Sequence, residues 1–179
     1  MIVSPQRTQR PWVGQRSAEP DPAPSFDPGC YHCPGTARAG GVHHPPYDTP
    51  VVFVNDFAAS LPAAPSPDAP SPGASPTSSE ADSPVDGLFG VAGATGECRV
   101  LCFSPRHDLT LADMTHDEVV AVIELWQSQL IELHQRYRWV QIFETRGAIS
   151  GASNPHPHGQ IWASTFLPDE IVQEMANQH

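Results

Sequence analysis

The stretch His156-Pro157-His158-Gly159-Gln160 is the part of the sequence that most decides the fold. Side chains alternate between the two faces of an extended strand, so His156, His158 and Gln160 are expected on one face, about 6.7 Å apart in succession. Pro157 favours this conformation, because its ring fixes φ and biases the preceding residue towards the extended region. The sequence therefore predicts a strand that presents three polar side chains together.

These three side chains suit a reaction centre. A neutral imidazole is both a good metal ligand and a competent nucleophile, and a glutamine amide can donate to a developing anion. One strand could therefore hold a ligand, a nucleophile and a charge stabiliser. The alternative is a polar loop whose histidines are solvated, and these residues alone do not decide between the two interpretations.

Length and composition limit the classes of protein that fit. The chain has 179 residues, which suits one domain with a real core. Its 20 acidic residues against 9 Lys and Arg give a net charge of −11, which argues against a nucleic-acid partner. No apolar run is long enough to span a membrane, and the opening MIVSPQRTQRPW lacks a secretory signal. We therefore expect a cytoplasmic protein with no membrane partner.

One composition shift interrupts the chain. Residues 61–84 read LPAAPSPDAPSPGASPTSSEADSP and contain seven prolines but almost no bulky apolar side chain. Such a segment cannot bury enough surface to offset the entropy lost on ordering. With the Gly-rich stretch that follows, residues 61–97 are predicted to be a disordered insertion in a domain that otherwise spans 1–179. A tolerated surface-loop insertion and a regulatory segment are both compatible with this composition.

The remaining segments alternate between strand and helix patterns. Strands are predicted at 51–55 (VVFVN), 99–103 (RVLCF), 139–144 (WVQIFE) and through the histidine stretch. The capping box Thr115-x-x-Glu118 begins a helix, and Pro168 begins a final one. Apolar side chains at helical spacing follow the capping box: Val119, Val122, Ile123, Trp126, Leu130, Leu133 and Tyr137. This order indicates an α+β fold, with helices flanking a mainly antiparallel sheet.

The cysteines and histidines also suggest a metal site. Cys30 and Cys33 form a Cys-x-x-Cys pair, which with His107 and His156 would supply the four ligands that zinc prefers. A redox pair is the alternative for this motif, although no thioredoxin-like context surrounds it. Cys98 and Cys102 share a strand face and are predicted to be packing residues. The other histidines are expected at the surface: His32, His43, His44, His116, His134 and His179.

Taken together, several motifs resemble one family. They are RPW (10–12), CYHCPGTARAGG (30–41), VFVNDFAA (52–59), CFSPRHDLTLADM (102–114) and SNPHPHGQIWA (153–163). This set is similar to the galactose-1-phosphate uridylyltransferases of the histidine-triad superfamily. The resemblance implies a histidine-triad-like fold and a chain that covers only the N-terminal half of a larger fold.

The resemblance also implies a reaction. In the family the second histidine of HPH, here His158, attacks the α-phosphorus of UDP-glucose and expels glucose 1-phosphate, and galactose 1-phosphate then takes the UMP. Gln160 matches a glutamine that contacts this phosphate. Further substrate contacts are implied at Arg7, Arg10, Ala39, Asn55, Asp56, Thr145 and Ser153. Thr145 stands where the family usually has an asparagine.

The same resemblance implies metals and partners. Cys30, Cys33, His107 and His156 match the ligands of a structural zinc, and Glu174 matches a ligand of a second metal, iron or zinc. A homodimer is implied for the full-length protein. Two alternatives remain open: a related nucleotidyltransferase acting on other sugars, such as ADP-sugars, and a truncated, non-catalytic module that binds zinc and a nucleotide.

Overall fold

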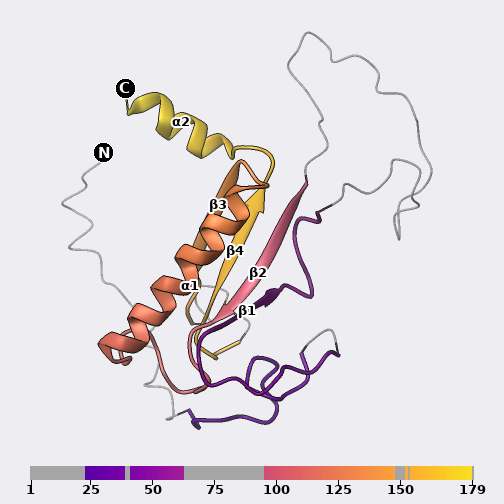
Figure 1. Cartoon of the computed structure of the whole chain (residues 1–179), viewed down its shortest axis with the longest axis vertical. Coiled ribbons are helices and arrows are strands. Elements are labelled where there is room, and N and C mark those ends of the chain that lie inside the picture. The colour runs from indigo at the N-terminus through magenta and orange to yellow at the C-terminus, as the bar shows by residue number, and fades with distance from the viewer. Residues whose placement is uncertain (1–22, 39–40, 63–94, 148–151, 153, 179) are drawn as a thin grey trace, which may run out of the picture.

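A four-stranded antiparallel sheet forms the centre of the molecule (Figure 1). The computed structural model describes residues 23–38, 41–62, 95–147, 152 and 154–178. The strands lie in the order β1-β2-β4-β3, and every neighbouring pair is antiparallel. Their bounds are β1 Val51–Val54, β2 Gly96–Cys102, β3 Trp139–Glu144 and β4 His158–Ser164, and the helices are α1 His116–His134 and α2 Asp169–Asn177. The predicted α+β class and the order of the elements are confirmed.

Helix α1 forms where the capping box predicted it. The backbone N–H of Glu118 donates to the Thr115 hydroxyl, and the Glu118 carboxylate accepts from the Thr115 N–H at 2.7 Å. The helix lies across one face of the sheet (Figure 1) and packs its apolar side onto it. The core consists of Leu101, Phe103, Val122, Leu133, Tyr137, Val140, Ile161 and Ala163.

Helix α1 is shorter than its apolar pattern suggested. It ends at His134, so the prediction that the helical spacing continues to Tyr137 is wrong. The chain instead closes a tight turn, in which the N–H of Tyr137 donates to the carbonyl of Leu133 at 2.9 Å. The Tyr137 ring nevertheless remains buried, because this turn directs the chain back towards β3.

Strand β2 begins earlier than predicted. Gly96 and Glu97, the last two residues of the predicted insertion, pair with Ser164 and Ala163 of β4. Only glycine fits at the first position, since a Cβ on Gly96 would lie 2.4 Å from the carbonyl oxygen of Ala163. Glu97 is buried and forms an ion pair with Arg99 at 2.6 Å. Residues 63–94 of the predicted insertion lie outside the described part of the chain.

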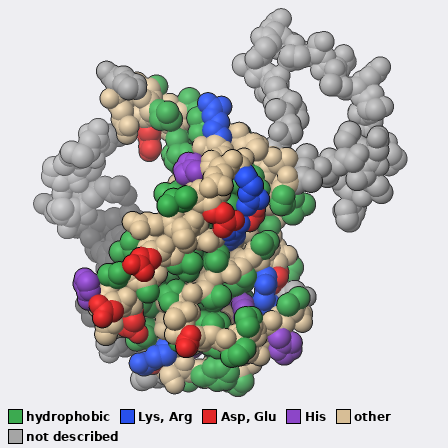
Figure 2. All heavy atoms as spheres, in the orientation of Figure 1, with side chains coloured by type: hydrophobic (Ala, Val, Ile, Leu, Met, Phe, Trp, Pro, Cys, Tyr) green, Lys and Arg blue, Asp and Glu red, His purple; other side chains and the backbone are tan. Residues whose placement is uncertain are grey.

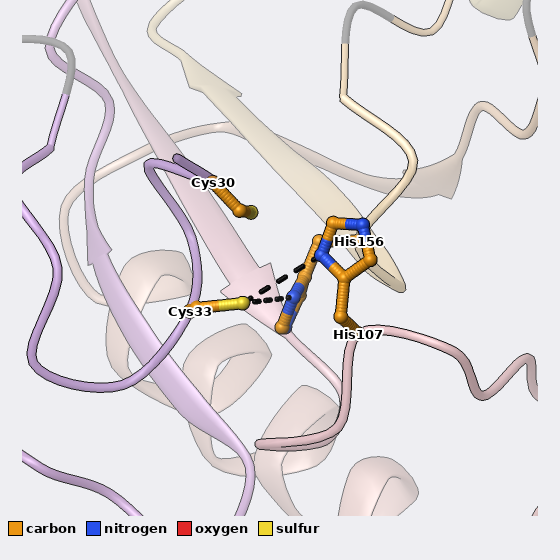
Figure 3. A group of neighbouring side chains, drawn as sticks. All are labelled: Cys30, Cys33, His107 and His156. Carbon is orange, nitrogen blue, oxygen red and sulfur yellow. Dashed lines mark hydrogen bonds between the residues drawn. The ribbon is translucent and has the colours of Figure 1, made fainter. Parts of the chain in front are cut away.

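The segment that precedes β1 lies against the end of the sheet where β2 finishes and β4 begins. Cys102, the last residue of β2, places its thiol 3.9 Å from the carbonyl oxygen of His32. This arrangement brings the Cys-x-x-Cys motif next to His156 of the HPH motif, which is far away in the sequence (Figure 3).

The surface matches the acidic composition. On the face shown in Figure 2, the Arg side chains of the described residues are separated by acidic and apolar ones and form no continuous basic surface. Helices long and apolar enough to cross a lipid bilayer are absent from the described residues.

Candidate active site and metal centre

Four buried side chains meet in one cluster (Figure 3). The ligand atoms of Cys30, Cys33, His107 and His156 all lie within 4.8 Å of one another. The Sγ of Cys33 lies 3.6 Å from Nδ1 of His107 and 3.6 Å from Nδ1 of His156. With metal–ligand bonds of about 2.3 Å to sulfur and 2.0 Å to nitrogen, a tetrahedral site has sulfur–nitrogen separations of about 3.5 Å. The cluster therefore has the donor set of a tetrahedral metal centre, and the two separations from Cys33 match its dimensions.

The Cys-x-x-Cys segment is a tight turn held from both sides. The N–H of Cys33 donates to the carbonyl of Cys30 at 3.3 Å, and the N–H of His32 donates to the Cys30 thiol at the same distance. The Thr36 hydroxyl lies 2.7 Å from the carbonyl oxygens of both cysteines. These bonds direct both sulfur atoms towards the histidines.

Hydrogen bonds to neighbouring groups set the orientation of His156. Its Nε2 lies 2.9 Å from the carbonyl oxygen of Ser104, so this nitrogen carries the proton and Nδ1 presents its lone pair to the cluster. Its backbone N–H donates to the Asn154 side chain at 2.8 Å, and Asn154 also contacts the Cys30 thiol at 3.5 Å. Burial lowers the pKa of His156 to about 4, which leaves the ring neutral and its Nδ1 lone pair able to bind a metal.

The prediction that His156 belongs to the histidine strand is wrong. Strand β4 begins at His158, and His156 lies in a bend that the Asn154 side chain closes. The bend turns the His156 ring towards Cys33 and the metal-capable cluster instead of leaving it on the strand face with His158 and Gln160. Those two residues line a cleft of about 350 Å³, and His156 is not among its lining residues.

His158 is oriented as a nucleophile would be. Its Nδ1 lies 2.7 Å from the carbonyl oxygen of His156 and must donate its proton to it. The lone pair therefore resides on Nε2. Gln160 lines the same cleft, and its amide oxygen accepts from the indole N–H of Trp162 at 3.3 Å, which leaves the amide nitrogen able to donate to an anion.

Asn55 and Asp56 border this cleft as well. Arg38 fixes the Asp56 carboxylate through a two-point ion pair, with nitrogen–oxygen distances of 2.5 and 3.2 Å. The same guanidinium donates to the carbonyl of Val54 at 2.5 Å and lies 4.3 Å above the ring of Phe53. The sequence interpretation missed Arg38. A signal was present in the sequence, because Arg38 is one of only 9 Lys and Arg residues and lies shortly after the Cys-x-x-Cys motif.

Two buried histidines correct a second expectation. His32 and His44 were predicted at the surface but are only 6% and 4% exposed. His44 places Nε2 3.2 Å from the carbonyl oxygen of Tyr31 and packs edge-on against Phe53. The His32 ring lies among those of Tyr31, Phe53, His156 and His158, and burial lowers its pKa to about 3. No pattern in the sequence separates these two from His43 and His116, which are exposed.

The remaining predicted site residues divide into two groups. Thr145 lines a small hollow together with His156 and His158. Glu174 is exposed on α2 and does not belong to the metal-capable cluster found among the described residues. Four others lie outside the described residues: Arg7, Arg10, Ala39 and Ser153.

Comparison with known proteins now identifies the family. Residues 1–168 match the family model described as galactose-1-phosphate uridyl transferase, N-terminal domain. The chain belongs to this family. It is 47% identical to the galactose-1-phosphate uridylyltransferase of Haemophilus influenzae, over 99% of this chain and 47% of that protein. It is also 47% identical to the Rattus norvegicus protein of the same name, over 99% of this chain and 44% of that protein.

The chain thus spans about half the length of the curated relatives it matches. Solved structures agree on the fold. A uridylyltransferase mutant matches with a TM-score of 0.65 at 20% identity, covering 90% of this chain and 44% of that one. An ADP-glucose phosphorylase from Arabidopsis thaliana matches with a TM-score of 0.58 at 19% identity, covering 94% and 46%.

Proposed function

We propose that this chain carries the nucleophile of an enzyme that transfers UMP from UDP-glucose to galactose 1-phosphate through a uridylyl-histidine intermediate. The observation that carries the proposal is the orientation of His158, whose Nδ1 is bonded to the His156 carbonyl while the side chain borders an open cleft. The family membership supplies the choice of substrates.

Two displacements at the same phosphorus make up the reaction. The lone pair on Nε2 of His158 forms a bond to the α-phosphorus of UDP-glucose, and the bond from that phosphorus to the bridging oxygen breaks. Glucose 1-phosphate leaves with the electron pair. A phosphate oxygen of galactose 1-phosphate then attacks the same phosphorus, and the electron pair of the nitrogen–phosphorus bond returns to Nε2.

The neighbours of His158 stabilise both steps. The imidazole becomes positively charged when it forms the bond, and the carbonyl of His156, accepting the Nδ1 proton at 2.7 Å, stabilises this charge. The Gln160 amide can donate to the phosphoryl oxygens, where negative charge accumulates. Asp56, held by Arg38, and Asn55 are suited to hydrogen bonding with the nucleoside of UDP-glucose.

Zinc is the metal we propose for the four-residue cluster. It would be held by Cys30, Cys33, His107 and His156 and would crosslink the loops on which the nucleophile depends. The other contacts implied by the family resemblance complete the proposal. They are phosphate contacts from Arg7, Arg10 and Ser153, nucleotide contacts from Ala39 and Thr145, a second metal at Glu174, a homodimer and a cytoplasmic location.

A turnover assay tests the function. The protein that contains this chain should form UDP-galactose from UDP-glucose and galactose 1-phosphate, and should lose this activity when His158 is replaced by alanine. Exposed His116→Ala is the matched control and should retain it. Turnover with ADP-glucose in place of UDP-glucose would assign a different specificity. Binding of UDP without any exchange would identify a non-catalytic nucleotide-binding module.

A further inference from the structure

His32 places a third imidazole beside the two histidines of the HPH motif. Its ring centroid lies 4.8 Å from that of His158, with the ring planes tilted by 51°, and 6.2 Å from that of His156. We infer that His32 is a positioning residue, which holds the His158 ring in the orientation required for attack. This inference rests on the proposed function of His158.

The His32 ring can restrain the His158 ring because its own position is fixed by several contacts. The backbone N–H of His32 donates to the Cys30 thiol at 3.3 Å, and its backbone carbonyl accepts from the Tyr47 hydroxyl. Its ring packs edge-on against Tyr31 at 4.6 Å and lies 5.8 Å from Phe53. With only 6% of the residue exposed, the ring has little freedom to rotate away.

The His158 ring depends on such a packing contact more than the His156 ring does. His156 is almost completely enclosed at 1% exposure, whereas His158 is partly exposed and borders the cleft. The hydrogen bond from Nδ1 to the His156 carbonyl fixes one edge of the ring. Contact with His32 restrains the ring from the side, and in-line attack at phosphorus depends on the direction of the Nε2 lone pair.

The His32 side chain acts through the packing of its ring and not through a hydrogen bond from Nδ1. The Nδ1 of His32 is buried without a hydrogen-bond partner among the described residues, which is unfavourable for a polar atom. His32 also stands between the metal-capable Cys30 and Cys33 in the sequence. The Cys-x-x-Cys turn that would hold the metal therefore also carries the ring that packs against His158. Metal binding and the orientation of the nucleophile are thereby coupled.

The test compares the rate at which UDP-glucose labels His158 in the protein that contains this chain. His32→Ala removes the ring that packs against His158. The rate constant for labelling should therefore fall about 10-fold or more, while KM for UDP-glucose changes less than about twofold. His32→Phe restores a ring and should recover most of the rate. Zinc content and thermal midpoint are measured for each variant. If His32→Ala fails to retain zinc, His32→Val, whose side chain is too short to reach His158, replaces it.

His44→Gln is the matched control. His44 is an equally buried histidine of the same segment, and in the described part of the chain its ring contacts are Tyr47 and Phe53. Glutamine can keep the bond to the Tyr31 carbonyl, so labelling should proceed at the unsubstituted rate. An unchanged rate in His32→Ala, or an equal loss in His32→Ala and His32→Phe, would overturn the positioning role alone. Absence of label in the unsubstituted protein would overturn the proposed function and the inference with it.

Discussion

The Nδ1 of His158 lies 2.7 Å from the backbone carbonyl oxygen of His156, and this bond connects the proposed nucleophile to the metal centre. The side chain of His156 belongs to the four-residue cluster, while its carbonyl orients the next histidine. A displacement of the His156 backbone therefore changes the direction of the His158 lone pair. A metal bound by this cluster would in this way influence the orientation of the proposed nucleophile.

The first prediction concerns the metal centre. Replacing Cys33 by serine removes the sulfur that lies 3.6 Å from both histidine nitrogens. Zinc content, measured by atomic emission, should fall well below one per chain, and the free energy of unfolding should fall by about 3 kcal/mol or more. Cys98→Ala is the control, because Cys98 is equally buried but lies outside the cluster. Full zinc occupancy in the Cys33 variant would show that the ligand assignment is wrong.

Arg38 should prove irreplaceable by lysine. A lysine keeps the charge but cannot form the two-point bond to Asp56 and also stack on Phe53, as Arg38 does. We expect Arg38→Lys to raise KM for UDP-glucose about 10-fold with a small change in kcat, because Asp56 loses its orientation while the nucleophile is untouched. Arg106→Lys, at an exposed ion pair with Asp108, is the control. Equal KM values in the two variants would argue against the role given to Asp56.

The stability of the protein should depend on pH through His44. Burial lowers the pKa of His44 below its ordinary value of 6.5, so the folded protein keeps the ring neutral where the unfolded chain takes up a proton. The free energy of unfolding therefore decreases as the pH falls below 6.5, because the unfolded chain then binds a proton that the folded protein does not. The free energy of unfolding, measured by urea titration at pH 7.5 and pH 5.5, should fall less in His44→Gln than in the unsubstituted protein. His116→Gln, at an exposed site, should leave the difference unchanged.

Gly159 is required by close packing. A Cβ at this position would lie 2.8 Å from Cζ of Phe103 and 3.0 Å from the carbonyl oxygen of Phe143. Gly159→Ala should therefore destabilise the fold by about 1–3 kcal/mol, as measured by thermal or urea unfolding. Gly29→Ala offers a comparison, since its nearest neighbour is a flexible Asp27 oxygen at 3.3 Å. Equal stability of the two variants would contradict this packing argument.

Local patterns in the sequence predicted the elements of the fold well. The capping box at Thr115 and the run of β-branched and aromatic residues at 139–144 depend on short-range rules, and the structure places α1 and β3 where those rules indicate. The four metal-capable residues could be selected because cysteine and histidine form a recognisable donor set. The structure brings these four together from three separate segments.

What the sequence could not supply depends on tertiary contacts. The bend at His156 exists because the Asn154 side chain caps its N–H, which outweighs the extended preference imposed by Pro157. His32 and His44 are buried because the segment before β1 folds over the end of the sheet. That segment is irregular, so its sequence has no periodicity from which the inward-facing side chains could be predicted. The pairing of Arg38 with Asp56 likewise joins two loops that only the fold brings together.

The site of covalent attachment tests the central claim most directly. The protein that contains this chain is incubated with UDP-glucose alone, so that the first displacement occurs without the second, and is then digested and mapped by mass spectrometry. We predict uridylyl label on His158 and none on His156, because the Nδ1 of His156 faces the metal cluster and its Nε2 donates to the Ser104 carbonyl. Label on His156, or label that persists in a His158→Ala protein, would contradict the account.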